Sequence, residues 1–147
     1  MRIGVALSNF LYIDRDSRST TVTRGRVLTC DSGFTLARNP DTVRGPDVAY
    51  VSRERWAGPL PDGYGEFAPD LAVEIRSPSD RTGAVLAKVG EWLDAGANLI
   101  WVIDPMRQHV TVYRADGSQA MLGLEDVLDG GSVLPGFSLW IAELFAA

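Results

Sequence analysis

The sequence predicts an α+β (α/β) fold, and three stretches carry that prediction. Residues 69–105 read in order as a strand, a turn, a helix and a second strand. Residues 22–37 read as two alternating strands around a hairpin turn at residues 31–33, and residues 109–113 as a further alternating strand. With 147 residues and 46% hydrophobic content, the chain can bury one ordinary core, so we expect a single domain over residues 1–147.

Composition excludes several classes of protein. One cysteine, Cys30, and one histidine, His109, can form neither an internal disulfide nor a Cys/His zinc site. Any metal would be held by carboxylates, which favours magnesium or manganese. The net charge of −5 argues against a protein that coats nucleic acid generally. No apolar run approaches the roughly 20 residues of a membrane span, and no signal-peptide cleavage site follows Met1, so we expect a cytoplasmic protein.

Residues 1–13 have the apolar spacing of a helix, at Ile3, Leu7 and Phe10. No N-terminal cap precedes them, so we expect the end of a helix whose beginning is missing. Such a shortened helix would leave apolar side chains uncovered, and uncovered apolar patches favour self-association. We therefore expect a homodimer with this segment at or near its interface.

Residues 46–51 predict a short strand that begins with Pro46 and Asp47. Proline is tolerated at the first position of a strand. Residues 52–68 follow as a long irregular loop with several prolines and glycines. Loops of that length in compact domains are usually functional or mobile.

Glu74 lies in the middle of the next predicted strand. Along residues 70–76 the side chains alternate, so that Glu74 faces away from the apolar residues Leu71, Val73 and Ile75. A half-buried carboxylate is costly unless a cation or hydrogen-bond donors meet it. We therefore expect a compensating partner for Glu74.

The following helix should run over residues 81–95, with an N-cap from the turn at residues 77–80 and a stop at Gly96. Lys88 falls on the flank of its apolar arc, from which a lysine can reach toward the sheet. It is the only lysine among the 14 basic residues, which suggests that a compact ammonium is needed here. The apolar arc comprises Val85, Leu86, Val89, Trp92 and Leu93.

The C-terminal third adds strands and a docking tail. Residues 98–103 form a continuous apolar run, as expected of a central strand covered on both faces. Residues 124–128 suggest a short helix. The end of the chain should dock on the core through Trp140, Leu144 and Phe145.

Asp47 and Glu74 are the strongest candidates for chemistry. On neighbouring strands their carboxylates can meet across about 5 Å and share one divalent cation. Asp70 lies roughly 13 Å along the strand from Glu74, which makes it a poorer ligand. With Lys88 approaching from the helix, this is the arrangement of a nuclease site.

A plainer interpretation remains open from spacing alone. Asp47 and Asp70 can be turn residues that follow prolines, Glu74 can be exposed, and Lys88 can be an ordinary surface lysine.

The chain resembles the Uma-two family of predicted restriction endonucleases in five motifs that occur in the same order. They are GPDVAYV, PDLAVEIRSPSD, K-x-x-x-W, GANLIWVIDP and HVTVY. That family is a branch of the PD-(D/E)xK nuclease superfamily. The likeness covers residues 25–145. It implies a restriction-endonuclease-like fold, a twisted mixed β-sheet flanked by helices, and a metal-dependent DNA endonuclease activity.

The resemblance assigns roles position by position. Asp47 matches the first metal-binding aspartate, and Glu74 matches the glutamate of the next core strand. Lys88 matches the lysine that this family carries on the following helix, and Trp92 stands where the family usually has tyrosine. Arg76 occupies the lysine position of the E-x-K motif, where arginine can touch phosphate but is a poor proton donor or acceptor.

We therefore expect an endodeoxyribonuclease that uses Mg²⁺ or Mn²⁺ and binds DNA with low affinity. Asp47 and Glu74 would bind the metal, Lys88 would orient the attacking water or stabilise the transition state, and Arg76 and Arg81 would contact phosphate. The alternative is a catalytically inactive module that binds nucleic acid or protein.

The resemblance also implies several dozen residues before the position of Met1, including the first acidic residue of the site. Without that residue we expect weak metal binding and reduced activity.

Overall fold

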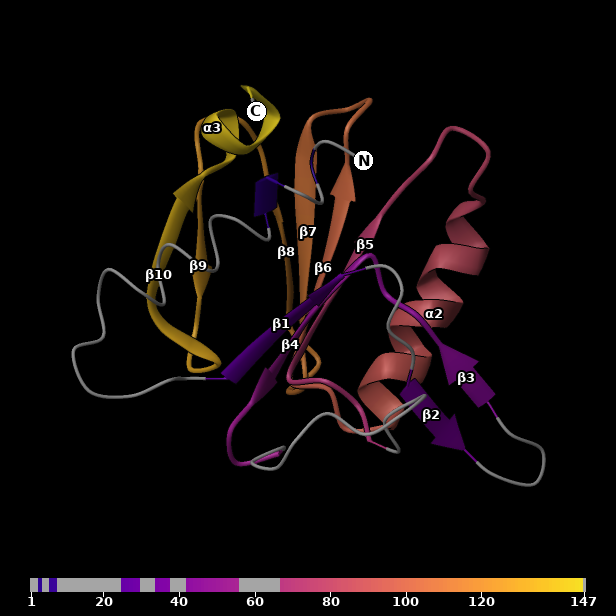
Figure 1. Ribbon diagram of the computed structural model, residues 1–147. Helices are drawn as coiled ribbons and strands as arrows, with labels where there is room; N and C mark the ends of the chain where they lie inside the picture. Colours follow the sequence, from indigo (N-terminus) through magenta and orange to yellow (C-terminus); the bar gives the residue numbers. More distant parts are fainter. Residues whose placement is uncertain are drawn as a thin grey trace.

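A six-stranded β-sheet forms the centre of the structure (Figure 1). The computed structural model describes residues 3, 6–7, 25–29, 34–37, 42–55 and 67–146. β5 and β6 are parallel and every other neighbouring pair is antiparallel, so the sheet is mixed, as predicted. Across the sheet the strands follow the order β1 (Gly25–Thr29), β4 (Val48–Ser52), β5 (Leu71–Ile75), β6 (Leu99–Asp104), β7 (His109–Arg114) and β8 (Gln119–Leu122).

One helix, α2 (Thr82–Asp94), connects the parallel strands β5 and β6. Parallel neighbours need such a crossover because the chain must return to the same end of the sheet. The helix predicted over residues 81–95 is confirmed, with bounds that differ by one residue at each end. It stops at the predicted place because Gly96 has a φ of 107°, a left-handed conformation that favours glycine.

The side-chain cap expected from residues 77–80 is wrong. Arg81 occupies the N-cap position and makes no side-chain cap hydrogen bond. The carboxylate of Asp80 instead accepts a hydrogen bond from the backbone N–H of Ser77 at 2.8 Å. Asp80 therefore closes the turn before the helix, a local bond that competes with capping.

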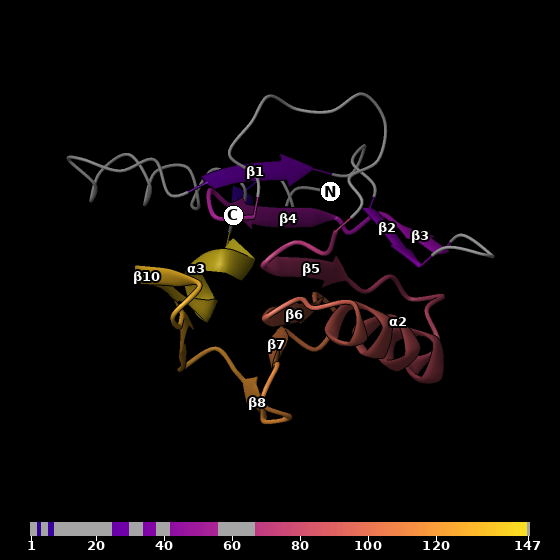
Figure 2. The same ribbon diagram turned by 90° about the horizontal axis from the view of Figure 1, so that it is seen from below.

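α2 and a small hairpin lie on one side of the sheet, called here the helix face (Figure 2). The hairpin consists of β2 (Phe34–Ala37) and β3 (Thr42–Arg44). Phe34 meets Trp92 of α2 edge to face, with ring centroids 5.9 Å apart. Aromatic pairs in this geometry add to the stabilisation that burial alone provides. The helix packs on the sheet through the buried residues Val85, Val89 and Trp92.

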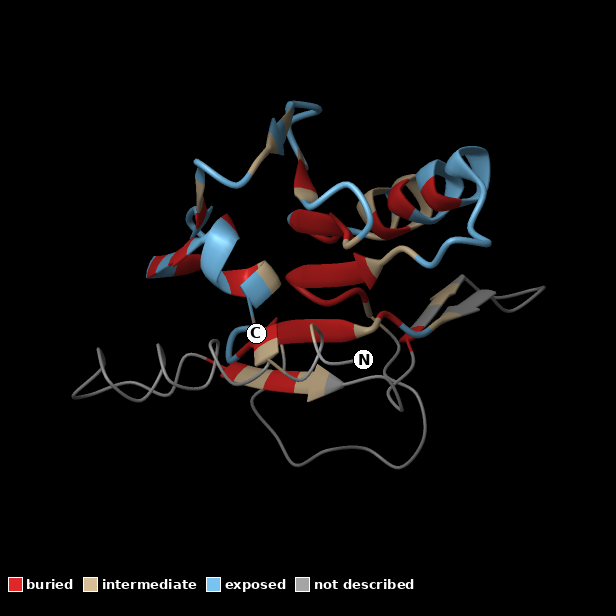
Figure 3. Ribbon diagram, turned by 90° about the horizontal axis from the view of Figure 1, so that it is seen from above, coloured by how far each residue is buried: buried red, intermediate tan, exposed pale blue. Residues whose placement is uncertain are grey.

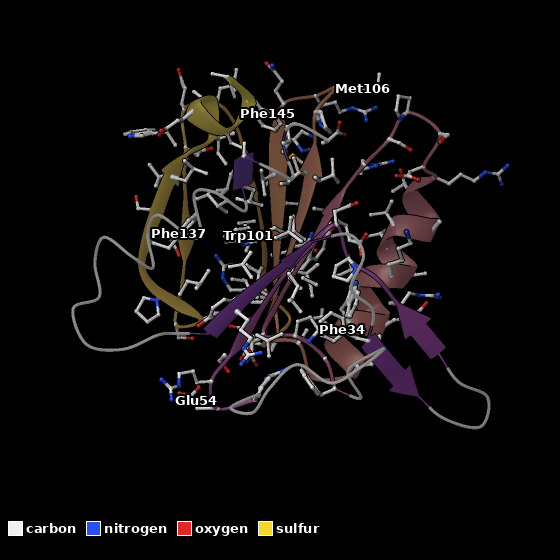
Figure 4. All side chains as sticks on the ribbon, viewed as in Figure 1. Phe34, Glu54, Trp101, Met106, Phe137 and Phe145 are labelled. Atoms are coloured by element: carbon white, nitrogen blue, oxygen red, sulfur yellow. The ribbon has the colours of Figure 1, made fainter. Side chains whose placement is uncertain are left out.

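The opposite face of the sheet is covered by β9 (Val127–Gly130), β10 (Leu134–Trp140) and α3 (Ile141–Ala146) (Figure 2). Trp101 of β6 lies against Phe137 of β10, with ring centroids 5.7 Å apart (Figure 4). This contact joins the C-terminal strands to the centre of the sheet.

The predicted central strand at residues 98–103 is confirmed, because every residue of β6 is buried (Figure 3). Burial on both faces explains why its sequence is a continuous apolar run rather than an alternating one. Within the described ranges, no helix is long and apolar enough to cross a membrane.

The hairpin expected around residues 31–33 is wrong, although the turn itself lies outside the described residues. β1 pairs with β4, and β2 pairs with β3. Val27 of β1 belongs to the core on the far side of the sheet, whereas Phe34 of β2 packs on the helix face. Leu28 of β1 also packs on the helix face, so the two strands contribute to the same core cluster without pairing with each other.

Two further predictions fail in the C-terminal part. Residues 124–128 are not a helix: a turn closed by Asp126 and Gly123, with a 2.8 Å hydrogen bond, leads directly into β9. Trp140 is 56% exposed, because the alternation of β10 buries Phe137 and Leu139 and turns Trp140 outward. Leu144 of the tail is buried, as predicted.

Leu7 is fully buried in the core on the far side of the sheet, so its expected exposure is wrong. Ile3 packs partly against the same core, and most of residues 1–13 lie outside the described residues. Most of the loop expected at residues 52–68 also lies outside the described residues. The homodimer stays a prediction, without support from Leu7.

Asp70 and Arg55 fasten three segments together. Asp70 is 7% exposed, and its Oδ2 accepts a hydrogen bond from the N–H of Ser52 at 2.6 Å. Its Oδ1 lies 3.1 Å from Nε of Arg55, whose Nη1 and Nη2 donate to O of Ala68 at 2.8 Å and to O of Gly96 at 2.7 Å. This clamp joins the end of β4, the start of β5 and the turn after α2, so Asp70 is structural.

Replacing Asp70 by Ala should lower the free energy of unfolding by about 2–4 kcal/mol, because the N–H of Ser52 and the Arg55 guanidinium lose their acceptor. Urea unfolding measures this change. As a control, Asp116→Ala removes a fully exposed aspartate and should change stability far less. Equal stability of the two variants would contradict the clamp.

Candidate active site

Asp47 lies beside Glu74 at the edge of the β4–β5 pairing. The last paired residues are Val48 and Val73. The N–H of Asp47 donates to O of Val73 at 3.0 Å, and its Oδ2 accepts from the N–H of Ile75 at 2.7 Å. Asp47 thus bonds to Val73 and to Ile75, the two residues that flank Glu74 in the sequence. The carboxylates of Asp47 and Glu74 are therefore neighbours. The predicted adjacency of the strands is confirmed, and the role of the carboxylates stays a prediction.

Glu74 is buried on the helix face, with 8% of its surface exposed, so the interpretation that it is an exposed residue is wrong. Its Oε2 accepts a hydrogen bond from Nε1 of Trp92 at 3.0 Å. Trp92 is therefore the compensating partner expected for Glu74 from the sequence. Neither Oε1 of Glu74 nor Oδ1 of Asp47 accepts a hydrogen bond from any residue in the described ranges.

Burial raises the pKa of the Glu74 carboxyl above its usual range. The hydrogen bond from Trp92 and the positive charge of Lys88 lower it, whereas the negative charges of Asp47 and Asp80 raise it further. Burial and repulsion outweigh the favourable contacts, so the site lacks positive charge. A divalent cation between the carboxylates would supply it.

Lys88 stands exposed on α2, one helical turn before Trp92. Its charge acts on Glu74, yet its ammonium makes no ion pair within 4 Å with any residue of the described chain. The helix thus brings Lys88 to the same side of the sheet as Glu74 and leaves the ammonium accessible.

Arg76 and Arg81 lie at the amino end of α2. Nη2 of Arg76 donates to O of Asp80 at 3.2 Å and to Oγ1 of Thr82 at 3.3 Å, which braces the turn between β5 and the helix. Arg81 is exposed at the N-cap. Their contacts with phosphate stay a prediction.

Arg44 and Glu91 form an ion pair beside the site that was not predicted from the sequence. Nε and Nη2 of Arg44 lie 2.8 and 2.9 Å from the two carboxylate oxygens of Glu91. The hydrogen bond and charge of Glu91, with a smaller contribution from Glu74, raise the pKa of Arg44, although burial opposes the shift. The position of Arg44, three residues before Asp47, was the available signal.

The described residues contain no group of three or more His, Cys, Asp or Glu side chains that could hold a metal. Asp47 and Glu74 offer two hard carboxylate oxygens. Mg²⁺ commonly binds through one or two carboxylates and keeps several waters, so the pair fits such an ion.

Replacing Glu74 by Gln should make stability less dependent on pH. Since folding raises the pKa of Glu74, the folded state holds its proton more tightly than the unfolded state, in which the pKa is about 4.3. Wild-type protein therefore loses stability as pH rises from that value through the folded-state pKa. The variant escapes this loss. Urea unfolding with a chelator should show that the free energy of unfolding of the variant, relative to wild type, increases from about pH 4 to about pH 8. A difference in free energy that does not change with pH would contradict the prediction.

Comparison with known proteins identifies the family of this chain and a structure with the same fold. The chain matches the Uma2 family, described as "Putative restriction endonuclease", over residues 6–142. It also matches the crystal structure of "a putative nuclease belonging to DUF820" from Anabaena variabilis, with a TM-score of 0.81 and 21% identity, over 98% of this chain and 78% of the other. No curated protein matches it. The structural match shows a shared fold, and the family match shows that the chain belongs to the Uma2 family.

Proposed function

We propose that this protein is an endodeoxyribonuclease that hydrolyses DNA phosphodiester bonds with the help of Mg²⁺ or Mn²⁺. The observation that carries the proposal is the pair of neighbouring carboxylates, Asp47 and Glu74, with the charge of Lys88 acting on the same group. Membership of a restriction endonuclease family supports the reaction class and DNA as substrate.

Oδ1 of Asp47 and Oε1 of Glu74 are the oxygens that would hold the ion. When bound, a divalent cation polarises the phosphate and makes water a better nucleophile at neutral pH. The second oxygen of each carboxylate is already held, by the N–H of Ile75 and by Nε1 of Trp92. These two bonds fix the orientation of the ligands before an ion arrives.

Lys88 acts as the positive group of the site. Its compact ammonium orients the attacking water or stabilises charge that develops on the phosphate. Arg76 and Arg81, at the amino end of α2, contact flanking phosphates. Arg76 is a poor proton donor or acceptor, because a guanidinium remains charged at all ordinary pH values.

Manganese should raise the melting temperature of the wild-type protein, since a ligand that binds only the folded state stabilises it by about 2.7 kcal/mol at 100 times its Kd. Glu74→Gln should abolish the increase because it removes one charged ligand. Asp70→Asn, at the structural carboxylate, is the control and should retain it. An equal increase in wild type and Glu74→Gln would place the ion elsewhere.

Lys88→Ala should slow manganese-dependent nicking of plasmid DNA by about 100-fold or more, as expected when a group that stabilises the transition state is lost. The manganese-induced rise in melting temperature should persist, since Lys88 does not hold the ion. Robust nicking by Lys88→Ala would remove Lys88 from the mechanism. DNA binding by the wild type without nicking or a manganese effect would favour the inactive binding module.

A further inference from the structure

An ion pair between Arg44 and Glu91 lies beside the candidate site. Two guanidinium nitrogens face two carboxylate oxygens, at 2.8 Å for Nε–Oε2 and 2.9 Å for Nη2–Oε1. Arg44 ends β3 and Glu91 lies on α2, and β3 runs beside this helix (Figure 1). The pair therefore connects the small hairpin to the helix that carries Lys88.

Both partners are close in sequence to proposed site residues. Arg44 precedes Asp47 by three residues, and Glu91 follows Lys88 by three residues and directly precedes Trp92, which binds Glu74. The negative charge of Glu74 contributes to the raised pKa of Arg44. The guanidinium thus lies within electrostatic reach of the carboxylates proposed to hold the ion.

The pair is partly exposed, although Nε of Arg44 and Oε2 of Glu91 are themselves buried. The side chains of Arg44 and Glu91 are 39% and 33% exposed, and ion pairs with that much solvent access add little to stability. The planar guanidinium fork can donate to two phosphate oxygens as well as to two carboxylate oxygens. A DNA phosphate that approaches this edge would compete directly with Glu91.

We propose that Arg44 binds a DNA phosphate of the substrate, and that Glu91 occupies its guanidinium until the phosphate displaces it. This inference rests on the proposed nuclease function. Arg44 is then a substrate-binding residue, and Glu91 is a positioning residue that keeps the fork aimed at the site while it lowers affinity for DNA. The alternative is that the pair only fastens β3 to α2.

The test measures binding of the full chain to a labelled DNA duplex in calcium, over a range of salt concentrations. Arg44→Gln should weaken binding about tenfold, and the salt slope should fall by about 1 because one phosphate contact is lost. Arg44→Lys should keep the slope but bind less tightly than wild type, since lysine retains the charge without the fork. Glu91→Gln should bind DNA more tightly.

Arg114→Gln is the matched control. Arg114 is also half-buried, but it lies far from the site along the strands. Its partner on β6 is Leu99, at the start of that strand, whereas the partner of Glu74 is Val102, near the other end. This variant should leave affinity and slope unchanged.

If Arg44→Gln lowers the melting temperature but leaves affinity and salt slope unchanged, the pair is a fastener and the inference is wrong. Nicking that requires manganese and Lys88 would in that case still support the proposed function. A wild-type chain that neither binds nor nicks DNA would instead overturn the proposed function and this inference with it.

Discussion

The hydrogen bond between Trp92 and Glu74 joins strand β5 to the helix that crosses the sheet, and the candidate site depends on that connection. Because β5 and β6 are parallel, the chain between them must cross one face of the sheet, and α2 makes that crossing. Trp92 is fully buried, packs against Phe34 and still presents its N–H to Glu74. One residue thus fixes the rotation of α2, and that rotation brings Lys88 and Glu91 to the side where the carboxylates lie.

Local periodicity was enough to predict α2, β5 and β6 from the sequence. The alternation around Glu74 placed it on the face opposite Val73, and the apolar spacing of the helix placed Trp92 toward the sheet. Adjacency of Asp47 and Glu74 followed once their strands were taken as neighbours. These features depend on contacts within one strand, one helix or one pair of strands.

Features that depend on distant partners could not be predicted. Turn residues suggested that β1 and β2 form a hairpin, but β1 pairs with β4 and β2 pairs with β3. Arg44 and Glu91 are 47 residues apart, and Glu91 alone reads as a solvent-facing helix residue. The cap expected from residues 77–80 failed because the Asp80 carboxylate bonds to the N–H of Ser77 within the turn instead of to the helix.

The buried carboxylates of this protein fall into two groups. Asp70 accepts a hydrogen bond from the N–H of Ser52 and forms an ion pair with Arg55. Asp104 accepts hydrogen bonds from the N–H groups of Met106 and Arg107 and from the Arg107 side chain. Burial raises the pKa of Asp104, but the hydrogen bonds from Arg107 and Met106 and the charge of His109 together outweigh it, so the net shift is downward. Glu74 has a single donor among the described residues, and its pKa rises. Incomplete compensation costs stability, and it leaves an oxygen able to bind an ion.

The positively charged side chains fall into the same two groups as the buried carboxylates. Arg55 binds a carboxylate and several backbone oxygens, and Arg107 binds Asp104, so these guanidinium forks serve structure. Lys88 has no ion pair within the described part of the chain, and its charge acts on Glu74 without a direct contact. Its placement near the least compensated carboxylate is therefore better explained by a ligand that both groups would contact than by packing. Arg44 stands between the two cases, because it is bound to Glu91 and yet exposed enough to change partner.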